Sequence, residues 1–336
     1  MKENYKSLDI AKFLFAFAVL TVHNCNYALS DNMLWFYFEH LIFRMSVPFF
    51  FLTSGFLFGI KVKANEDKKV EYIKKNVRNL LRHYLFWGVT YSIVTIGFNL
   101  KHGMTIKGVV FIAIRDFLTF NPILMWYIGA LIFSFLVIGL IHHKKTFQIS
   151  LIIGAFLYCV GMLMGSYSGL FTGTIVEDAL QIYYKLFVNS SNGIFVGYIF
   201  VGLGYYIGRY VEKTISKKKL ILQILIGYIV ISTEIMIVNN IPKCLEGNYD
   251  YLLGSLIISP ALFLLILQCN VPDKISTDFF RKASSCIYFS HMLVISGVNL
   301  LFDLPLTVQY LLVIMIVTIG SVIIYKWNNK YINMIT

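Results

Sequence analysis

The first apolar segment, residues 8–29, reads LDIAKFLFAFAVLTVHNCNYAL, a long apolar run with a few polar side chains. About 20 apolar residues suffice to cross a bilayer as a helix. Lys12 and His23 lie eleven positions apart, so on a helix they share one face at a rise of about 16 Å. Because both groups are costly to bury in a membrane, the pair predicts a site. A snorkelling lysine and a hydrogen-bonded core histidine would give the same pattern.

The chain as a whole is too apolar for a soluble protein. Of its 336 residues, 58% are hydrophobic and 14% are charged, whereas soluble domains carry about 25% charged residues. The net charge of +12 would by itself favour nucleic acid as a partner. However, the lysines and arginines lie in short stretches between apolar runs, as they do in membrane proteins. The composition therefore predicts a protein that lies in the lipid bilayer and binds no nucleic acid.

Ten apolar segments are long enough to span a membrane as helices. They cover roughly residues 8–29, 34–60, 83–100, 122–141, 149–165, 191–211, 220–239, 251–268, 283–301 and 306–326. We therefore predict an all-α polytopic membrane protein with about ten transmembrane helices. Residues 1–336 are expected to form a single integral-membrane domain. The first segment is predicted to be a retained helix, because it is too long for a signal peptide and no small-residue cleavage site follows it.

The basic residues also predict an orientation. If the segments alternate in direction, the stretches 61–82, 142–148, 212–219 and 269–282 fall on the side of both termini and hold most of the lysines and arginines. Cytoplasmic loops of membrane proteins carry such an excess of positive charge. We therefore expect a multi-pass protein of the plasma membrane with cytoplasmic termini and with Cys244 in an outer loop.

Several enzyme classes lack their sequence signatures. The five cysteines are scattered, and no Cys/His cluster has metal-ligand spacing. The chain contains no Walker A sequence, no dinucleotide-binding glycine motif and no Gly-x-Ser-x-Gly elbow. We therefore expect no metal, no ATP-driven or dinucleotide chemistry and no serine-hydrolase mechanism.

The second apolar segment carries a cation of its own. Arg44 is expected about ten residues below the outer end, too deep for easy access to water, so it requires a partner. Glu39 is one candidate counter-ion, and a purely structural ion pair remains open. Ser46 and Pro48 are expected to bend the helix. The Ser-Gly pair that ends at Gly55 predicts close helix packing rather than chemistry.

Polar and aromatic residues recur in later segments. His291 is expected mid-span in the ninth segment with Tyr288 one turn earlier, a pattern more typical of a hydrogen-bonded core histidine than of a functional one. Trp126 near the outer end of the fourth segment fits an interfacial aromatic belt equally well. Arg78 and Arg82 share a helix face at the membrane, where they suit either a phosphate-bearing ligand or anionic lipid headgroups.

Motifs along the chain follow an order that is typical of a known family. They are Leu8-Asp9 ahead of Lys12-x10-His23, Pro48-Phe49-Phe50 and Ser54-Gly55-Phe56 after Arg44, the basic segment with Arg78 and Arg82, Met125-Trp126-Tyr127, and Tyr288-Phe289-Ser290-His291. Over nearly its whole length the chain thereby resembles the membrane acyltransferase-3 family. Members typically have arginine where Lys12 stands, so this chain keeps the charge but loses the bidentate geometry of a guanidinium.

The resemblance implies a membrane O-acyltransferase with acetyl-CoA, or another acyl-CoA, as the donor. The acceptor would be a hydroxyl of a cell-surface or lipid-linked carbohydrate, with His23 as the general base. Asp9 and Lys12, three positions apart, are expected to pair. The implied catalytic residues are His23, Arg44, Lys12, Asp9 and His291, the donor-binding residues Lys12, Arg78 and Arg82, and the acceptor-binding residues Glu39, Trp126 and Tyr288.

Two functions from other classes remain open on the sequence. A transporter or flippase for an amino acid, an acyl group or a lipid-linked glycan would also carry basic residues inside the membrane. The absence of an internal sequence repeat weakens this alternative, because many transporters are built from repeats. The other alternative is a non-catalytic scaffold of a glycan-synthesis complex. Whether the chain forms a homodimer or joins such a complex is not determined by the sequence.

Overall fold

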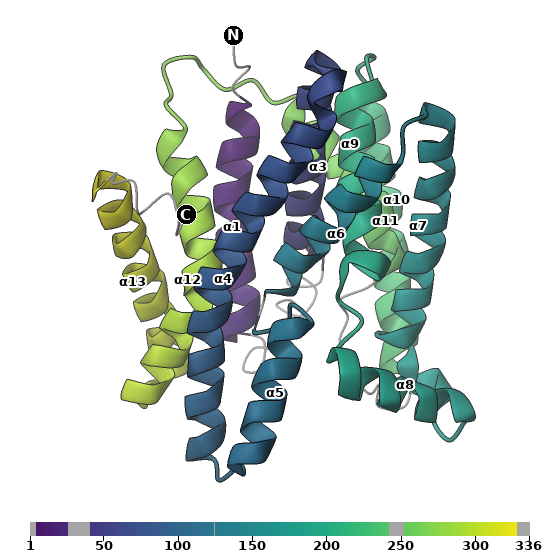
Figure 1. The fold of residues 1–336 in the computed structure, drawn as a ribbon. Helices are drawn as coiled ribbons and strands as arrows, with labels where there is room; N and C mark the ends of the chain where they lie inside the picture. The colour runs from purple at the N-terminus through teal and green to yellow at the C-terminus, as the bar shows by residue number, and fades with distance from the viewer. Residues whose placement is uncertain (1–4, 26–40, 124, 242–251, 328–336) are drawn as a thin grey trace. The chain divides into compact units, whose positions relative to one another are not determined.

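The fold is entirely helical where it is described. The computed structural model describes residues 5–25, 41–123, 125–241 and 252–327. These residues form helices and connecting turns without any strand, which confirms the predicted all-α class (Figure 1). Glu39 and Cys244 lie outside the described residues.

The chain packs into two compact units, each made from segments that are distant in sequence. The first unit comprises Met1–Phe50, Ile215–Ile221 and Ala261–Thr336, and the second comprises Phe51–Thr214 and Leu222–Pro260. The last boundary along the chain follows Pro260, which lies inside helix α11 and removes one backbone hydrogen-bond donor there.

The first unit is organised around one central helix. Helix α12 (Asp278–Leu301) packs against both α1 (Lys6–Cys25) and α13 (Leu306–Trp327). The ring of Phe13 in α1 lies 5.1 Å from that of Phe280 in α12, and such aromatic contacts contribute beyond the area that they bury. A short 3-10 turn, η1 (Phe43–Met45), also packs against α1. Three segments that are far apart in sequence, α12, α13 and η1, thus pack against α1.

The second unit holds most of the remaining helices. Its elements are α3 (Ser46–Ala64) from Phe51 onward, η2 (Glu66–Lys68), α4 (Lys69–Lys101), α5 (Ile106–Leu118), α6 (Trp126–Leu140), α7 (Lys144–Met164), η3 (Ser168–Phe171), α8 (Ile175–Phe187), η4 (Gly193–Gly197), α9 (Tyr198–Tyr210), most of α10 (Lys217–Asn239) and the N-terminal half of α11 (Leu253–Leu267). The α4 and α6 helices pack together, and η4 packs against both α6 and α7.

Glycines allow two helices of the second unit to cross at backbone contact. A side chain added at Gly55 of α3 would meet the carbonyl oxygen of Val201 at 1.9 Å. A side chain added at Gly204 of α9 would meet the carbonyl oxygen of Leu52 at 2.1 Å. This contact confirms the close packing predicted at Gly55, and its physical basis is the small-residue interface typical of membrane helices.

Each of the ten expected segments contains a helix, but not every helix is long enough to cross a membrane. Six helices of the described residues are long and apolar enough by length and composition, including α1 and α12. The apolar helices α6 and α11 are shorter, with 15 residues each. The number of membrane crossings, their orientation and the single membrane domain therefore remain predictions.

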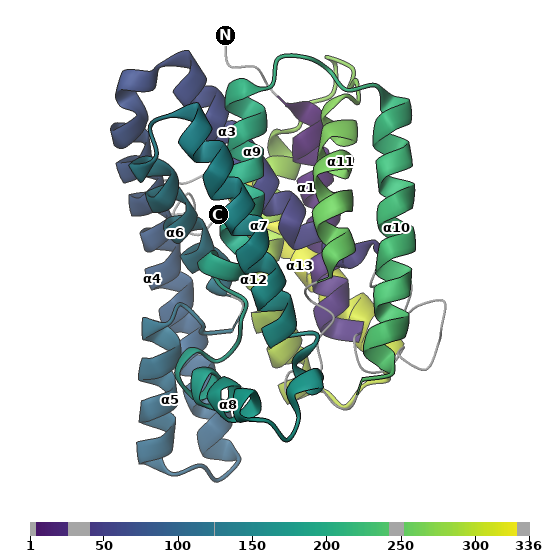
Figure 2. The ribbon, with the colours of Figure 1, turned by 90° about the vertical axis from the view of Figure 1, so that its right-hand side faces the viewer.

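Two of the segments between the expected spans contain helices that the apolar pattern did not predict. Residues 101–121 include α5, and residues 166–190 include α8, which runs crosswise to α7 in both views (Figures 1 and 2). In α8, Ile175 and Ile182 are exposed while Leu180 is buried. Each helix has only 13 residues, so neither matches the length of a membrane span.

Candidate active site

The two histidines expected inside the membrane lie together in the first unit. Their ring centroids are 5.5 Å apart, and the ring planes are inclined by 31°. His23 comes from the last turn of α1 and is exposed, whereas His291 comes from the middle of α12 and has no exposed surface. The packing of α1 on α12 creates this pair, which the separate helical patterns could not predict.

The surroundings of the pair hold His291 in place. Its Nδ1 atom lies 2.7 Å from the carbonyl oxygen of Tyr288 and 3.1 Å from that of Ile287. The Tyr288 ring is 6.1 Å from the His291 ring and packs edge-on against Phe50 at 5.7 Å. Tyr288, implied as an acceptor-binding residue, therefore lies beside the histidine pair and is itself buried.

Helix α13 adds polar groups that the sequence analysis missed. The hydroxyl groups of Thr21 and Tyr310 share a hydrogen bond of 2.8 Å, and Gln309 donates to Asn24 over 3.4 Å. These contacts join the C-terminal half of α1 to the first turns of α13. In the sequence, Gln309 and Tyr310 look like ordinary polar residues near a helix start, so no signal marked them.

Arg44 also belongs to this unit, but its local structure differs from the prediction. It lies in η1, the turn before α3, rather than ten residues inside a continuous helix, and α3 begins only at Ser46. Pro48 falls in the first turn of α3, where proline is tolerated, so the expected mid-helix bend is wrong. Because η1 packs against α1, Arg44 lies on a segment that contacts the helix carrying His23.

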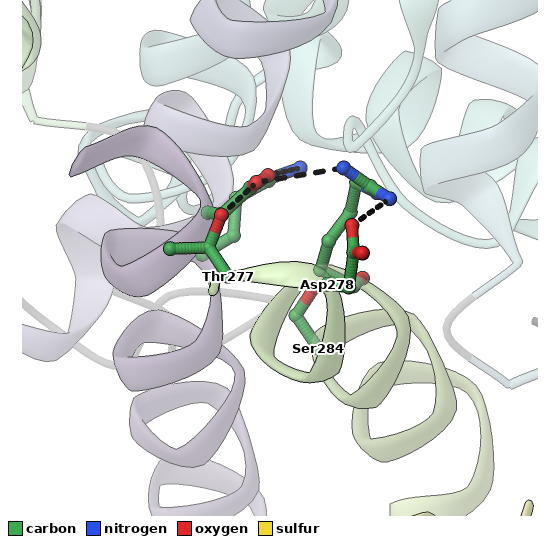
Figure 3. Close-up of polar contacts among 6 residues, drawn as sticks. Thr277, Asp278 and Ser284 are labelled. Atoms are coloured by element: carbon green, nitrogen blue, oxygen red, sulfur yellow. Dashed lines mark hydrogen bonds and ion pairs between the residues drawn. The ribbon is translucent and has the colours of Figure 1, made fainter. Parts of the chain in front are cut away.

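The predicted ion pair between Asp9 and Lys12 forms at the N-terminal end of α1. The Lys12 ammonium lies 3.3 Å from Asp9, and the lysine side chain keeps 18% of its surface exposed. Asp9 also accepts a hydrogen bond of 2.9 Å from Thr277 and lies 3.8 Å from Arg281 (Figure 3). Because α1 is continuous, Lys12 and His23 keep the helical register that places them on one face.

Partners from α12 complete this charged cluster and were not predicted. Arg281 forms a 2.5 Å contact with Asp278, the first residue of α12, which lies three positions earlier (Figure 3). Asp9 is 6% exposed and Thr277 is 1% exposed, so their bond is shielded from water. A buried carboxylate needs such partners, because an unpaired buried charge is costly.

The other implied residues lie in the second unit. Arg78 and Arg82 are exposed on α4, where their spacing keeps them on one helix face. Trp126 begins α6, and its ring lies 5.9 Å from that of Phe51. The placement of these three residues relative to His23 stays a prediction, as do the roles implied for all the site residues.

Comparisons with known proteins agree with the motif order. Residues 5–326 match the family model described as an acyltransferase domain. The chain is 29% identical over 341 residues to a serine/alanine racemase of Enterococcus gallinarum, covering 95% of this chain and 46% of that protein. It is 29% identical over 231 residues to an amino-acid racemase of Enterococcus faecalis, covering 63% of this chain and 30% of that protein.

These relatives are longer proteins than this chain, which spans less than half of either. No solved structure matches the chain. The family model covers nearly all of the described residues. It includes the charged cluster around Asp9 and the pair of His23 and His291. The chain therefore belongs to the acyltransferase-3 family.

Proposed function

We propose that this membrane protein is an acyl-CoA-dependent O-acyltransferase that acylates, most simply acetylates, a hydroxyl of a cell-surface or lipid-linked carbohydrate. The observation that carries the proposal is the accessible imidazole of His23, held on a membrane helix of an acyltransferase-3 protein beside a second, buried histidine. An imidazole titrates near neutral pH, so it can both take and return a proton during acyl transfer.

The chemistry requires one base and one stabilising cation. His23 takes the proton of the acceptor hydroxyl, and the oxygen attacks the carbonyl carbon of the thioester. Arg44, carried by the turn η1 that packs against α1, stabilises the oxyanion of the tetrahedral intermediate. The carbon–sulfur bond then breaks, and the CoA thiolate leaves and takes the proton from His23. The products are an O-acyl ester and free CoA.

The donor would bind at the cytoplasmic face. Arg78 and Arg82 are exposed on α4 and suit the phosphates of CoA, because guanidinium groups pair with phosphate oxygens in a bidentate manner. Lys12, partly exposed on the same face of α1 as His23, would line the path of the pantetheine arm. Trp126 and Tyr288 would contact the sugar, as would Glu39 outside the described residues.

This arrangement requires a defined orientation in the plasma membrane. With both termini in the cytoplasm, His23 lies in the outer half of its span, between an inner donor and an outer acceptor. An impermeant thiol reagent applied to intact cells tests the orientation at Cys244. Labelling there without permeabilisation supports the proposal, and labelling only after permeabilisation contradicts it.

The decisive experiment measures acyl transfer in cells and in reconstituted vesicles. Surface glycans are compared for ester-linked acyl groups between cells that express the wild type, His23→Ala or neither. Purified protein in liposomes is then supplied with radiolabelled acetyl-CoA, and release of CoA is followed with and without extracted glycan. Loss of glycan esters in the His23→Ala cells, with equal protein in the membrane, is the expected result. Equal ester content in all three would overturn the proposal.

A second candidate function rests on the named relatives. Proteins named as amino-acid or serine/alanine racemases share the region that matches this chain, which favours an amino acid as a ligand of that region. A carrier that moves an amino acid without acyl transfer would fit this observation and the basic membrane residues. Uptake of radiolabelled serine or alanine into the same liposomes, in the absence of acyl-CoA, distinguishes the carrier from the enzyme.

A further inference from the structure

We infer that His291 is a positioning residue that accepts a hydrogen bond at Nε2 and thereby selects the tautomer of His23. The inference begins with the Nδ1 atom of His291, which lies within hydrogen-bond distance of the carbonyl oxygens of Tyr288 and Ile287. A carbonyl oxygen can only accept, so Nδ1 must carry the proton in a neutral ring. The tautomer of His291 is therefore assigned by its own helix.

The opposite nitrogen of His291 is left as an acceptor. With the proton on Nδ1, Nε2 presents a lone pair, and the ring has no exposed surface through which water could reach it. Among the residues that the structure describes, no group donates to this Nε2 atom. Buried polar atoms nearly always find a partner, so this acceptor calls for a donor. The sequence predicted a hydrogen-bonded core histidine at position 291. Among the described residues, however, only its Nδ1 atom has a hydrogen-bond partner.

His23 is the donor that the geometry favours. Its ring is 5.5 Å from that of His291, a separation at which a nitrogen of each ring can meet directly or through one water molecule. The planes are inclined by 31°, and rotation of the accessible His23 ring about its side-chain bonds can bring an N–H toward Nε2. The rotation is available to His23 alone, because two backbone contacts hold His291.

The consequence concerns the second nitrogen of His23. If one nitrogen donates to His291, the other carries the lone pair and faces the accessible side of α1. A base whose lone pair already points outward needs no reorientation before it takes a proton. The kinetic consequence rests on the proposed acyltransferase function, whereas the tautomer of His23 can be measured without any activity.

Two amide substitutions separate the nitrogens of His291. Glutamine places its amide near the position of Nε2 and can accept there, whereas asparagine reaches only the position of Nδ1. We expect His291→Asn to lower kcat for acyl transfer about 10- to 100-fold with little change in the KM for acyl-CoA. His291→Gln should recover most of that loss. Ser290→Ala is the matched control, because its hydroxyl donates to the carbonyl oxygen of Cys286 in the same helix.

A spectroscopic measurement keeps the inference testable if no acyl transfer is found. In protein labelled with 15N-histidine, the His23 resonances are assigned by difference from His23→Ala. A single His23 tautomer in the wild type and in His291→Gln, with a mixture in His291→Asn, supports the inference. The same tautomer ratio in all three variants overturns it, as does equal kcat for the asparagine and glutamine variants. Failure of the wild type to transfer acyl groups would instead count against the proposed function.

Discussion

Thr277, the residue before the first turn of α12, donates its hydroxyl to Asp9 of α1 over 2.9 Å instead of capping its own helix. A threonine at this position ordinarily accepts from a backbone N–H of the first turn. Here the hydroxyl bridges two helices, and the two bonded residues are 268 positions apart in sequence. The start of α12 is thereby tied to the carboxylate that also pairs with Lys12.

The bridge predicts a measurable loss of stability. Thr277→Val keeps the side-chain shape but removes the donor, and we expect it to destabilise the protein by about 1 kcal/mol or somewhat more, because the buried carboxylate loses a partner. Thr277→Ser keeps the donor and should melt closer to the wild type. Melting temperatures in detergent at one scan rate provide the comparison, and a serine variant as unstable as the valine variant would contradict the bridge.

The ion pair at Lys12 predicts how substitutions at that position behave. Lys12→Arg keeps a cation for Asp9 and should retain acyl transfer, in keeping with the arginine typical of the family. Lys12→Ala leaves Asp9 with Thr277 and Arg281 and removes the cation from the path toward His23, so transfer should fall at least about tenfold. Acyl release from acetyl-CoA in liposomes measures both. If Lys12→Ala transferred acyl groups at the wild-type rate, the shared face of Lys12 and His23 on α1 would have no role in acyl transfer.

The accessible imidazole predicts a separation of activity from assembly. His23→Ala should lose acyl transfer by about 100-fold or more, because the substitution removes the proposed general base. Membrane insertion should be unaffected, since alanine is less costly to place in a bilayer than histidine. Extraction yield and gel-filtration profile report assembly. Near-normal transfer by well-assembled protein would exclude His23 as the base.

The arginines of α4 predict a salt-dependent donor site. Arg78→Ala combined with Arg82→Ala should weaken CoA binding in detergent, and the loss should shrink as salt rises, because exposed phosphate contacts are screened. Lys74→Ala combined with Lys75→Ala is the matched control, since these lysines are also exposed on α4. Equal CoA affinity in the arginine variant and the wild type would assign the arginines to lipid headgroups.

The glycine crossing of α3 and α9 predicts a steric defect. Gly204→Ala should destabilise the second unit by about 1–3 kcal/mol or prevent its assembly, because the added methyl group would meet backbone rather than a movable side chain. Gly97→Ala in α4 meets nothing within 4 Å and should be neutral or stabilising by up to about 1 kcal/mol. Thermal melts of the two variants give the test. Equal melting temperatures would rule out the tight crossing.

The sequence by itself determined what depends on short-range periodicity. The long apolar runs require helices in a membrane, because backbone groups there must bond within their own segment, and a helix follows in each expected run. The pair of Asp9 and Lys12 was predictable for the same reason, since a spacing of three positions on one helix brings side chains together. Gly55 was predictable as a packing position from residue size alone.

Only the tertiary structure decided which helices meet and where polar side chains face one another. The contact of His23 with His291 and the bond from Thr277 to Asp9 both require α12 to pack on α1, and no local pattern encodes the partner of a helix. Likewise, the position of Arg44 in a turn depends on where η1 packs against α1. Periodicity defines the faces of a helix, whereas side-chain packing between distant segments decides which face is matched to which.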